Sequence, residues 1–186
     1  MRIVIDPGHG GRDCGAVDPV QPLEGDQLNT FEAELNYEIA CRVKSYLEQE
    51  GIIGILTRKP GEFVPLDARA ELANRLRADA FVSVHLNAAA SPLAQGFEVF
   101  AFPGSPWGAR LRDAVRQAVA AEFPDWTNRG AKTANFAVLR ETFCPACLVE
   151  CGFITNPDEE RRLGSAAIRD KFSRAIATGV IKFLDT

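Results

Sequence analysis

Residues 3–11 read IVIDPGHGG, and residues 80–85 read AFVSVH. Each stretch opens with a short run of mostly apolar residues, which is typical of a buried strand, and each leads to a histidine. Helical segments and further short apolar segments alternate along the rest of the chain. This alternation predicts an α/β fold, with one domain, a mostly parallel twisted sheet and helices on both faces.

The other elements follow from apolar periodicity and from the residues that end helices. We expect strands at residues 3–6, 52–57, 80–85, 96–102, 136–139 and 146–150. We expect helices at residues 30–50, 66–77 and 105–122, and a closing helix from Arg161 or Ser165 to Phe183. Gly51 follows the first helix, where glycine commonly forms the cap. Since no repeat or linker divides the chain, residues 1–186 are expected to form one domain.

Charge and hydropathy argue against several classes of partner. The net charge is −4 and no dense block of Lys and Arg occurs, so we expect no nucleic-acid partner. No run of 18 apolar residues occurs, so we expect no membrane insertion. The first residues lack the charged and long apolar segments of a secretory signal, so no signal peptide is expected.

Only two histidines occur, His9 and His85, and each follows an apolar strand. If these strands are parallel neighbours, the two imidazoles meet at the same edge of the sheet. Imidazole is the commonest metal ligand, and two imidazoles with one carboxylate make a catalytic zinc site. The alternative is two unrelated histidines, one in a loop and one buried, and spacing alone leaves both interpretations open.

The third ligand is expected to be an acid on the buried face of the helix at residues 30–50. At about 100° per residue, Glu32 falls within the apolar stripe, whereas Glu34 and Glu38 point away from it. A buried carboxylate is costly unless it is paired or bound to a metal, so Glu32 is selected. The alternative is a capping box in which Glu32 pairs with Asn29. The apolar stripe consists of Leu35, Ile39, Val43 and Tyr46.

A fourth acid, Glu150, ends the apolar run at residues 146–150. An acid at the end of a buried strand is placed to take a proton from a metal-bound water, although a solvated strand end is the alternative. The glycines around His9 lack the Lys-Ser/Thr of a phosphate-binding loop and the spacing of a dinucleotide fingerprint. We expect them to let the backbone turn sharply around His9.

The odd number of cysteines indicates mostly free thiols rather than a disulfide framework. Cys144 and Cys147 form a CxxC pair, but this pair opens a strand, whereas redox proteins place it at the start of a helix. Cys147 and Cys151 alternate with Glu150, so they should face away from the site and pack as small apolar groups.

Taken together, these segments resemble the type 3 family of N-acetylmuramoyl-L-alanine amidases, the zinc hydrolases of the bacterial cell wall. The likeness runs nearly from end to end and keeps the order of the family's motifs. It is carried by residues 5–11 (IDPGHGG), Glu32 with Asn36, residues 82–87 (VSVHLN) and residues 145–156 (PACLVECGFITN).

The resemblance implies that residues 1–186 are a zinc-dependent catalytic domain that acts on peptidoglycan. His9, Glu32 and His85 match the ligands of one Zn²⁺ per chain, and Glu150 matches the catalytic acid. The bond cleaved would join N-acetylmuramic acid to L-alanine of the stem peptide. Asn87 and Arg129 are candidates for substrate contact.

Three departures from the family pattern affect the details. Ala33 stands where the family usually has Lys, and the loop at residues 17–29 is acidic and fairly long. Cys147 and Cys151 replace residues that are usually apolar. Some cell-division relatives also carry a helical insertion that blocks the metal, and since this chain lacks one, we expect no need for an activator protein.

The setting and three rival functions remain open from sequence alone. The chain is expected to act at the cell wall, as a lysin released when the membrane is breached, as an enzyme released on lysis, or as a fragment of an exported protein. The rivals are a peptidoglycan-binding module without catalysis, another zinc hydrolase such as a peptidase or deacetylase, and a thiol redox protein using Cys144 and Cys147.

Overall fold

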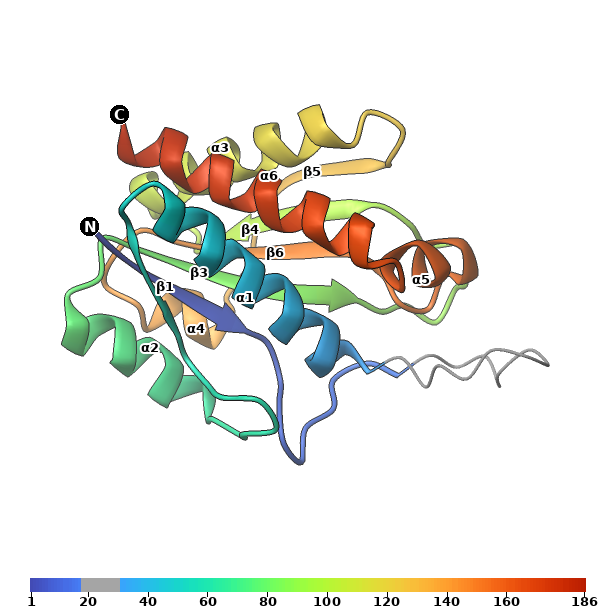
Figure 1. The fold of residues 1–186 in the computed structure, drawn as a ribbon, viewed down its shortest axis with the longest axis horizontal. Helices are drawn as coiled ribbons and strands as arrows, with labels where there is room; N and C mark the ends of the chain where they lie inside the picture. Colours follow the sequence, from blue (N-terminus) through green and yellow to red (C-terminus); the bar gives the residue numbers. More distant parts are fainter. Residues whose placement is uncertain (18–30) are drawn as a thin grey trace.

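Six strands form one sheet in the computed structural model, which describes residues 1–17 and 31–186 (Figure 1). Their order across the sheet is β2-β1-β3-β6-β4-β5. The first four run parallel, β4 runs antiparallel to β6, and β5 runs parallel to β4. The prediction of a mostly parallel sheet is therefore confirmed. The strands are β1 (Arg2–Pro7), β2 (Ile53–Leu56), β3 (Ala80–Asn87), β4 (Phe97–Ala101), β5 (Asn128–Thr133) and β6 (Ala146–Phe153).

Helices cover both faces of this sheet, as the sequence predicts. On one face, α6 (Ala166–Leu184) packs against α1 (Glu32–Gln49) and α3 (Pro106–Glu122) over the larger apolar core. On the other face, α2 (Leu66–Leu76) and α4 (Ala137–Arg140) cover a smaller core. The remaining helix, α5 (Pro157–Leu163), follows β6 and lies beside its carboxyl end (Figure 1).

The carboxyl ends of β1, β3 and β6 meet at one edge of the sheet, where α1 also begins (Figure 1). Because β4 is antiparallel to β6, β4 begins at this edge rather than ending there. Ligands of α/β sheets bind outside the carboxyl ends of the parallel strands. This edge is where the candidate site lies.

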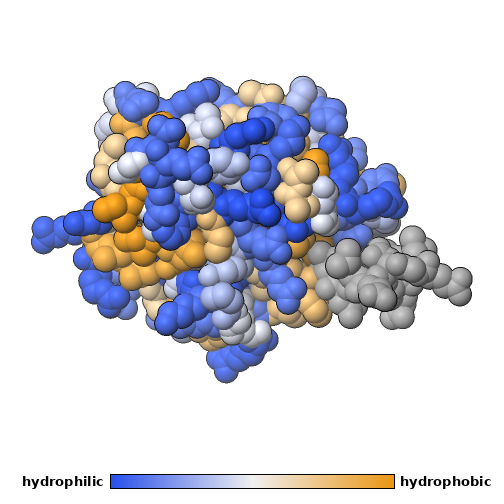
Figure 2. All heavy atoms as spheres, viewed as in Figure 1, coloured by the Kyte–Doolittle hydropathy of each residue, from blue (hydrophilic) through white to orange (hydrophobic). Residues whose placement is uncertain are grey.

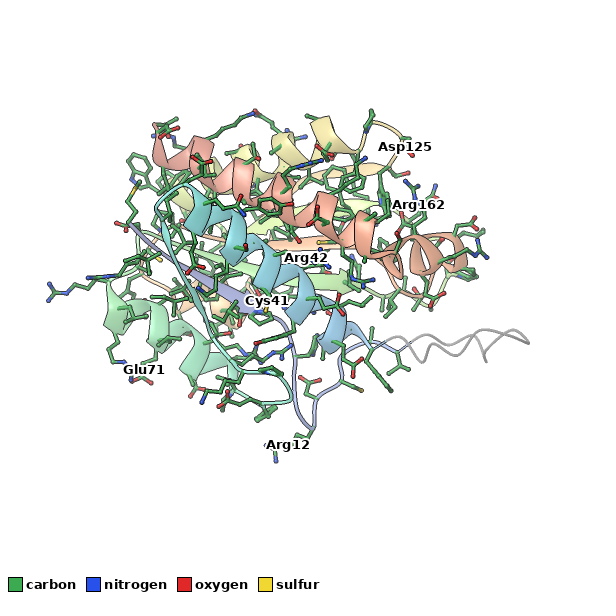
Figure 3. All side chains as sticks on the ribbon, in the orientation of Figure 1. Arg12, Cys41, Arg42, Glu71, Asp125 and Arg162 are labelled. Atoms are coloured by element: carbon green, nitrogen blue, oxygen red, sulfur yellow. The ribbon has the colours of Figure 1, made fainter. Side chains whose placement is uncertain are left out.

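The amphipathic pattern of α1 explains how it packs on the sheet. Its predicted stripe is buried at Leu35, Ile39 and Val43, while Glu34 and Glu38 are exposed. A charged pair adds a second attachment, because Arg42 of α1 lies 3.2 Å from the Asp170 carboxylate of α6. Arg42 lies at the middle of α1 in Figure 3. The buried stripe holds α1 on the sheet, with its first turn at the sheet edge.

Helix α5 ties the start of β4 to the end of β6. The buried Glu159 carboxylate accepts hydrogen bonds of 2.7 Å from the backbone N–H groups of Gly96 and Phe153. Farther along α5, Arg162 lies 3.0 Å from Asp125, which follows α3 (Figure 3). These contacts fix the wall of the sheet edge on the β4 side.

Four expectations about the elements need correction. Residues 136–139 do not form a strand: α4 begins at Ala137, and its buried Val138 and Leu139 pack on the smaller core. Strand β5 was not expected, because it carries almost no apolar side chains. The separate helix α5 was not expected; it starts after Asn156, whose side chain accepts hydrogen bonds from the first turn, whereas the expected start of the closing helix at Ser165 is confirmed by α6. The first helix begins at Glu32 rather than at residue 30, which lies outside the described residues.

All five cysteines are free, as the sequence indicates, and Cys147 and Cys151 are fully buried in the larger core. The face in Figure 2 is largely hydrophilic, with separate apolar areas between the charged side chains. Among the described residues, none of the helices combines the length and apolarity that a membrane span requires.

Candidate metal centre and active site

The His9 loop leaves β1 through a tight and strained turn. The Gly8 N–H still donates to the Val84 carbonyl of β3, at 2.9 Å, so the chain stays next to β3 at this point. His9 then adopts φ 60°, a left-handed conformation that is uncommon for a residue with a side chain. Such strain persists only where surrounding contacts hold it, and it is concentrated at functional sites.

Two buried arginines supply those contacts. Arg69 donates from Nη1 to the Pro7 carbonyl (2.8 Å) and from Nη2 to the His9 carbonyl (2.7 Å). Arg58 donates from Nε to Pro7 (2.9 Å) and from Nη2 to the Gly8 carbonyl (3.2 Å). Charge-assisted hydrogen bonds of this kind are stronger than neutral ones, so the loop is held firmly at the sheet edge.

His9, Glu32 and His85 lie together at this edge. Nε2 of His9 is 3.2 Å from one Glu32 oxygen, and Nδ1 of His85 is 3.1 Å from the other. One nitrogen or oxygen atom from each of the three side chains lies within 4.8 Å of those of the other two. The expectation that both histidines meet at one edge, next to a buried acid, therefore holds.

The Glu32 carboxylate is fixed from several directions. It accepts hydrogen bonds from the backbone N–H groups of Ala16 (2.8 Å) and Leu86 (3.1 Å) and from the Asn36 amide (3.1 Å). The residue that caps α1 is Phe31, which makes no side-chain cap, and Asn29 lies outside the described residues. Both oxygens of Glu32 thus serve the histidine cluster, which leaves the capping-box alternative without support.

The electrostatics of the cluster favour a cation. The hydrogen bond to Glu32 is the main cause that raises the pKa of His9 to about 9, against the opposing effect of burial, and Asp13 adds to it. Burial alone would lower the pKa of His85, but its hydrogen bond to Glu32 and the charge of Glu150 raise it. Burial would raise the pKa of Glu32, yet the two imidazoles hold it well below its usual value. The site therefore stabilises positive charge at its centre.

Asp13 orients His9 within this cluster. Its carboxylate lies 2.9 Å from Nδ1 of His9 and also accepts a hydrogen bond from the Gly15 N–H, at 3.1 Å. A carboxylate on one ring nitrogen fixes the tautomer and directs the other nitrogen, here Nε2, toward a metal. Asp13 was not among the candidates expected from the sequence, although its position four residues after His9 in a polar loop was a usable signal.

Two glycines allow the donors to come this close. A Cβ on Gly8 would lie only 2.2 Å from Cε1 of His85. A Cβ on Gly15 would lie 2.6 Å from a Glu32 oxygen and 2.7 Å from Cδ2 of His9. The backbone therefore forms a cradle around the three side chains. Two imidazoles and one carboxylate held in this way suit a zinc ion with an open coordination position.

Glu150 of β6 is paired with His85 of β3, so both side chains project from the same face of the sheet. Oε2 of Glu150 is buried and makes no hydrogen bond with any described residue. Burial raises the pKa of Glu150 to about 7, with the charges of Glu32 and Glu98 adding to this effect and His85 opposing it. A half-buried acid that has a buried, unpaired oxygen and a pKa near neutrality is suited to exchange protons.

Asn87 and Arg129 lie around a further acid, Glu98, which was not among the candidates expected from the sequence. The Asn87 amide donates to Oε1 of Glu98 (2.6 Å), and Nε of Arg129 donates to Oε2 (2.8 Å). Glu98 is only 5% exposed although it lies in an otherwise apolar strand. That isolated acid among apolar residues was a signal the sequence contained.

The chain was compared with known families and structures. Residues 3–182 match the profile of the family described as N-acetylmuramoyl-L-alanine amidase. The amidase CwlM of Bacillus licheniformis is 36% identical over 185 residues, which cover 98% of this chain and 68% of CwlM. The amidase AmiA of Escherichia coli is 31% identical over 225 residues, which cover 97% of this chain and 75% of AmiA.

A solved structure agrees with these sequence matches. The crystal structure of an N-acetylmuramoyl-L-alanine amidase from Clostridium difficile 630 has a TM-score of 0.92 and 34% identity to this chain. The match covers 100% of this chain and 97% of the other. The fold, the histidine–glutamate cluster and the family match lead to one conclusion. The chain belongs to the N-acetylmuramoyl-L-alanine amidase family and is an amidase that hydrolyses peptidoglycan.

Proposed function

We propose that His9, Glu32 and His85 hold one Zn²⁺ and that Glu150 carries the proton during amide hydrolysis. The observation that supports this most directly is the arrangement of four side chains. Three metal-binding groups converge within 4.8 Å, and the acid paired with His85 in the sheet has a buried oxygen without a partner among the described residues. The bond cleaved is the amide between the lactyl group of N-acetylmuramic acid and L-alanine of the stem peptide.

The side chains have separate roles in this mechanism. When bound, Zn²⁺ acts as a Lewis acid that polarises the scissile carbonyl and makes a neighbouring water more acidic. Glu150 accepts the proton of the attacking water and then gives it to the leaving amine of L-alanine. A base with a pKa near 7 suits both steps, since it can accept and release a proton near neutral pH. Asp13 keeps Nε2 of His9 directed at the cluster throughout.

The proposal extends to the substrate and the setting. Asn87 and Arg129 contact the muramyl peptide, and residues 1–186 form a zinc-dependent catalytic domain that acts at the bacterial cell wall without an activator protein. The proposal of no activator rests on the segment between β3 and β6, where the described elements are β4, α3, β5 and α4 and no further helix is inserted.

The test is hydrolysis of purified peptidoglycan by the isolated chain, with and without a chelator. We expect new L-alanine amino termini that disappear with the chelator and return when Zn²⁺ is added. L-alanine amino termini that appear at the same rate with the chelator present would contradict the zinc proposal. Other new termini would instead indicate a peptidase or deacetylase, and activity only after a second protein is added would contradict the absence of an activator.

A further inference from the structure

Glu98 lies in a row of side chains that crosses the candidate site. His85 of β3 pairs with Glu150 of β6, and Glu150 pairs in turn with Glu98 of β4. Paired residues on neighbouring strands project from the same face, so the three side chains lie side by side. With strands about 4.8 Å apart, Glu98 stands roughly 10 Å from His85, beyond the reach of a metal bound there.

The Glu98 carboxylate serves as an anchor for side chains at the rim of the site. One oxygen binds the Asn87 amide, and the other binds both Nε of Arg129 and the Lys132 ammonium. Burial would raise the pKa of Glu98, but its hydrogen bonds with Lys132 and Arg129 outweigh burial and lower it. Glu98 therefore stays ionised, and this part of the rim carries one negative and two positive groups.

Arg129 is a fixed cation that keeps part of its hydrogen-bonding capacity unused. Its Nε binds Glu98, its Nη1 binds the Gln95 carbonyl (3.2 Å), and its guanidinium lies 4.9 Å from the centre of the Phe153 ring. Its side chain is 34% exposed, and no described residue accepts a hydrogen bond from Nη2. Three contacts thus fix the Arg129 guanidinium, while the two N–H groups of Nη2 have no acceptor among the described residues.

The direction of the strands separates Arg129 from Lys132. Strand β4 begins at the sheet edge that carries the metal cluster, and β5 runs parallel to it. Arg129 stands at the start of β5, whereas Lys132 pairs with Phe100, farther from that edge. Of the two cations on Glu98, Arg129 is therefore the one nearer the sheet edge that carries the metal cluster.

We propose that Glu98 is a positioning residue that fixes Arg129 so that its guanidinium binds a carboxylate of the stem peptide. This rests on the proposed function, because the anion must belong to the muramyl peptide whose amide bond lies at the metal cluster. A guanidinium presents paired donors that match a carboxylate, and holding it in place beforehand reduces the entropy lost on binding. The carboxyl group of the first stem residue is itself held in an amide bond, so the nearest carboxylate that the stem can leave free is on the second residue. The amidase should therefore prefer stems in which this carboxylate is free.

Two soluble muramyl peptides test this, one with a free carboxylate on the second stem residue and one with the carboxamide in its place. Binding is measured by calorimetry on the zinc-loaded Glu150→Gln protein, so that neither peptide is consumed. We expect the carboxylate form to bind roughly 10- to 100-fold more tightly. In the Glu150→Gln background, Arg129→Ala should abolish this difference in affinity between the two peptides. Lys132→Ala in the same background should leave most of the difference.

The role of Glu98 is tested in the same series. Glu98→Gln should remove the preference for the carboxylate peptide, as Arg129→Ala does. Because Glu98 acts through Arg129, the double variant should lose no more binding free energy for this peptide than either single variant. If Glu98→Gln does not fold, Glu98→Asp is the second variant. It keeps the charge, but its side chain is shorter by one methylene, so it should also lose the preference for the carboxylate peptide. If Glu98 had only a structural role, its substitution would weaken the binding of both peptides equally and leave the ratio of their affinities unchanged.

Equal binding of the two peptides, or a preference that survives Arg129→Ala, would overturn this assignment. So would strictly additive losses from Glu98→Gln and Arg129→Ala. These outcomes are distinct from a failure of the proposed function, which would appear as chelator-insensitive hydrolysis by the unmodified chain. The binding comparison does not depend on hydrolysis at all.

Discussion

Glu150 of β6 stands opposite His85 of β3, and on its other side it stands opposite Glu98 of β4. The two acids share one face of the sheet but differ in their surroundings. Glu98 is bound by three donor side chains, whereas Oε2 of Glu150 has no partner among the described residues. The sheet thus holds one acid ionised and fixed, and it leaves the other free to exchange a proton.

The first prediction concerns Glu150. Glu150→Gln keeps the size of the side chain but cannot accept a proton, so turnover should fall by about 100- to 10,000-fold, the usual contribution of a general acid–base group. Because Glu150 is not one of the three convergent donors, the zinc content should stay near one per chain. His85→Ala, in contrast, should lose both zinc and activity. Elemental analysis and a peptidoglycan assay on the three proteins check this, and a Glu150→Gln protein with a near-normal rate would remove Glu150 from the mechanism.

The second prediction concerns pH. Glu150 acts as a base in its ionised form, so kcat/KM should fall as the pH drops through its pKa. That pKa is raised to about 7 by burial, and a bound cation should lower it because positive charge favours the carboxylate. We therefore expect the acid limb of the kcat/KM profile at or below pH 7. Glu98→Gln removes a neighbouring negative charge, so it should lower the pKa of Glu150 and move this limb to lower pH. A limb that stays at the same pH would show that the charge of Glu98 does not influence Glu150.

The third prediction concerns Asp13. Asp13→Ala removes the carboxylate at 2.9 Å from Nδ1 of His9, which leaves the ring free to change tautomer and orientation. Loss of such an outer partner typically weakens metal binding by about 10- to 100-fold. Competition with a zinc chelator measures this directly. Glu71→Ala, which removes an exposed acid from the middle of α2, is the matched control and should leave zinc affinity unchanged (Figure 3).

The sequence contained most of the information that places the metal cluster. His9 and His85 each follow a buried strand, and Glu32 lies on the buried face of an amphipathic helix, so local periodicity made all three candidates. The order of the family motifs, rather than spacing, then favoured their meeting at one edge. Glu98 and Asp13 were not selected because their roles depend on partners distant in sequence or on a loop conformation. A hydrogen bond such as that from Arg129 to Glu98, across 31 residues, has no counterpart in a local pattern.

The errors in the predicted fold have similar physical causes. The residues at 136–139 are apolar, and so short a run cannot distinguish a strand from a single helical turn. Strand β5 is polar and mostly exposed, and it exists because its backbone pairs with β4 at the margin of the sheet. Neither the pairing nor the burial of Val138 beneath α2 can be read from residues that are adjacent in the chain.

The last prediction concerns Gly8, whose backbone lies against the His85 ring. In Gly8→Ala the new Cβ would lie 2.2 Å from Cε1 of His85, so the ring must move away. Displacement of a catalytic group by about 1 Å can cost about 100-fold in rate, and overpacking of this kind costs about 1–3 kcal/mol of stability. The decisive comparison is Gly8→Ala in the His85→Ala background, where the ring that causes the clash is absent. In that background the added methyl group should cost almost no free energy of unfolding, as measured with urea. The measurement does not depend on activity, which both His85→Ala and the double variant lack. An equal loss of stability in the two backgrounds would show that Gly8 is required for the backbone of the His9 loop rather than for room beside His85.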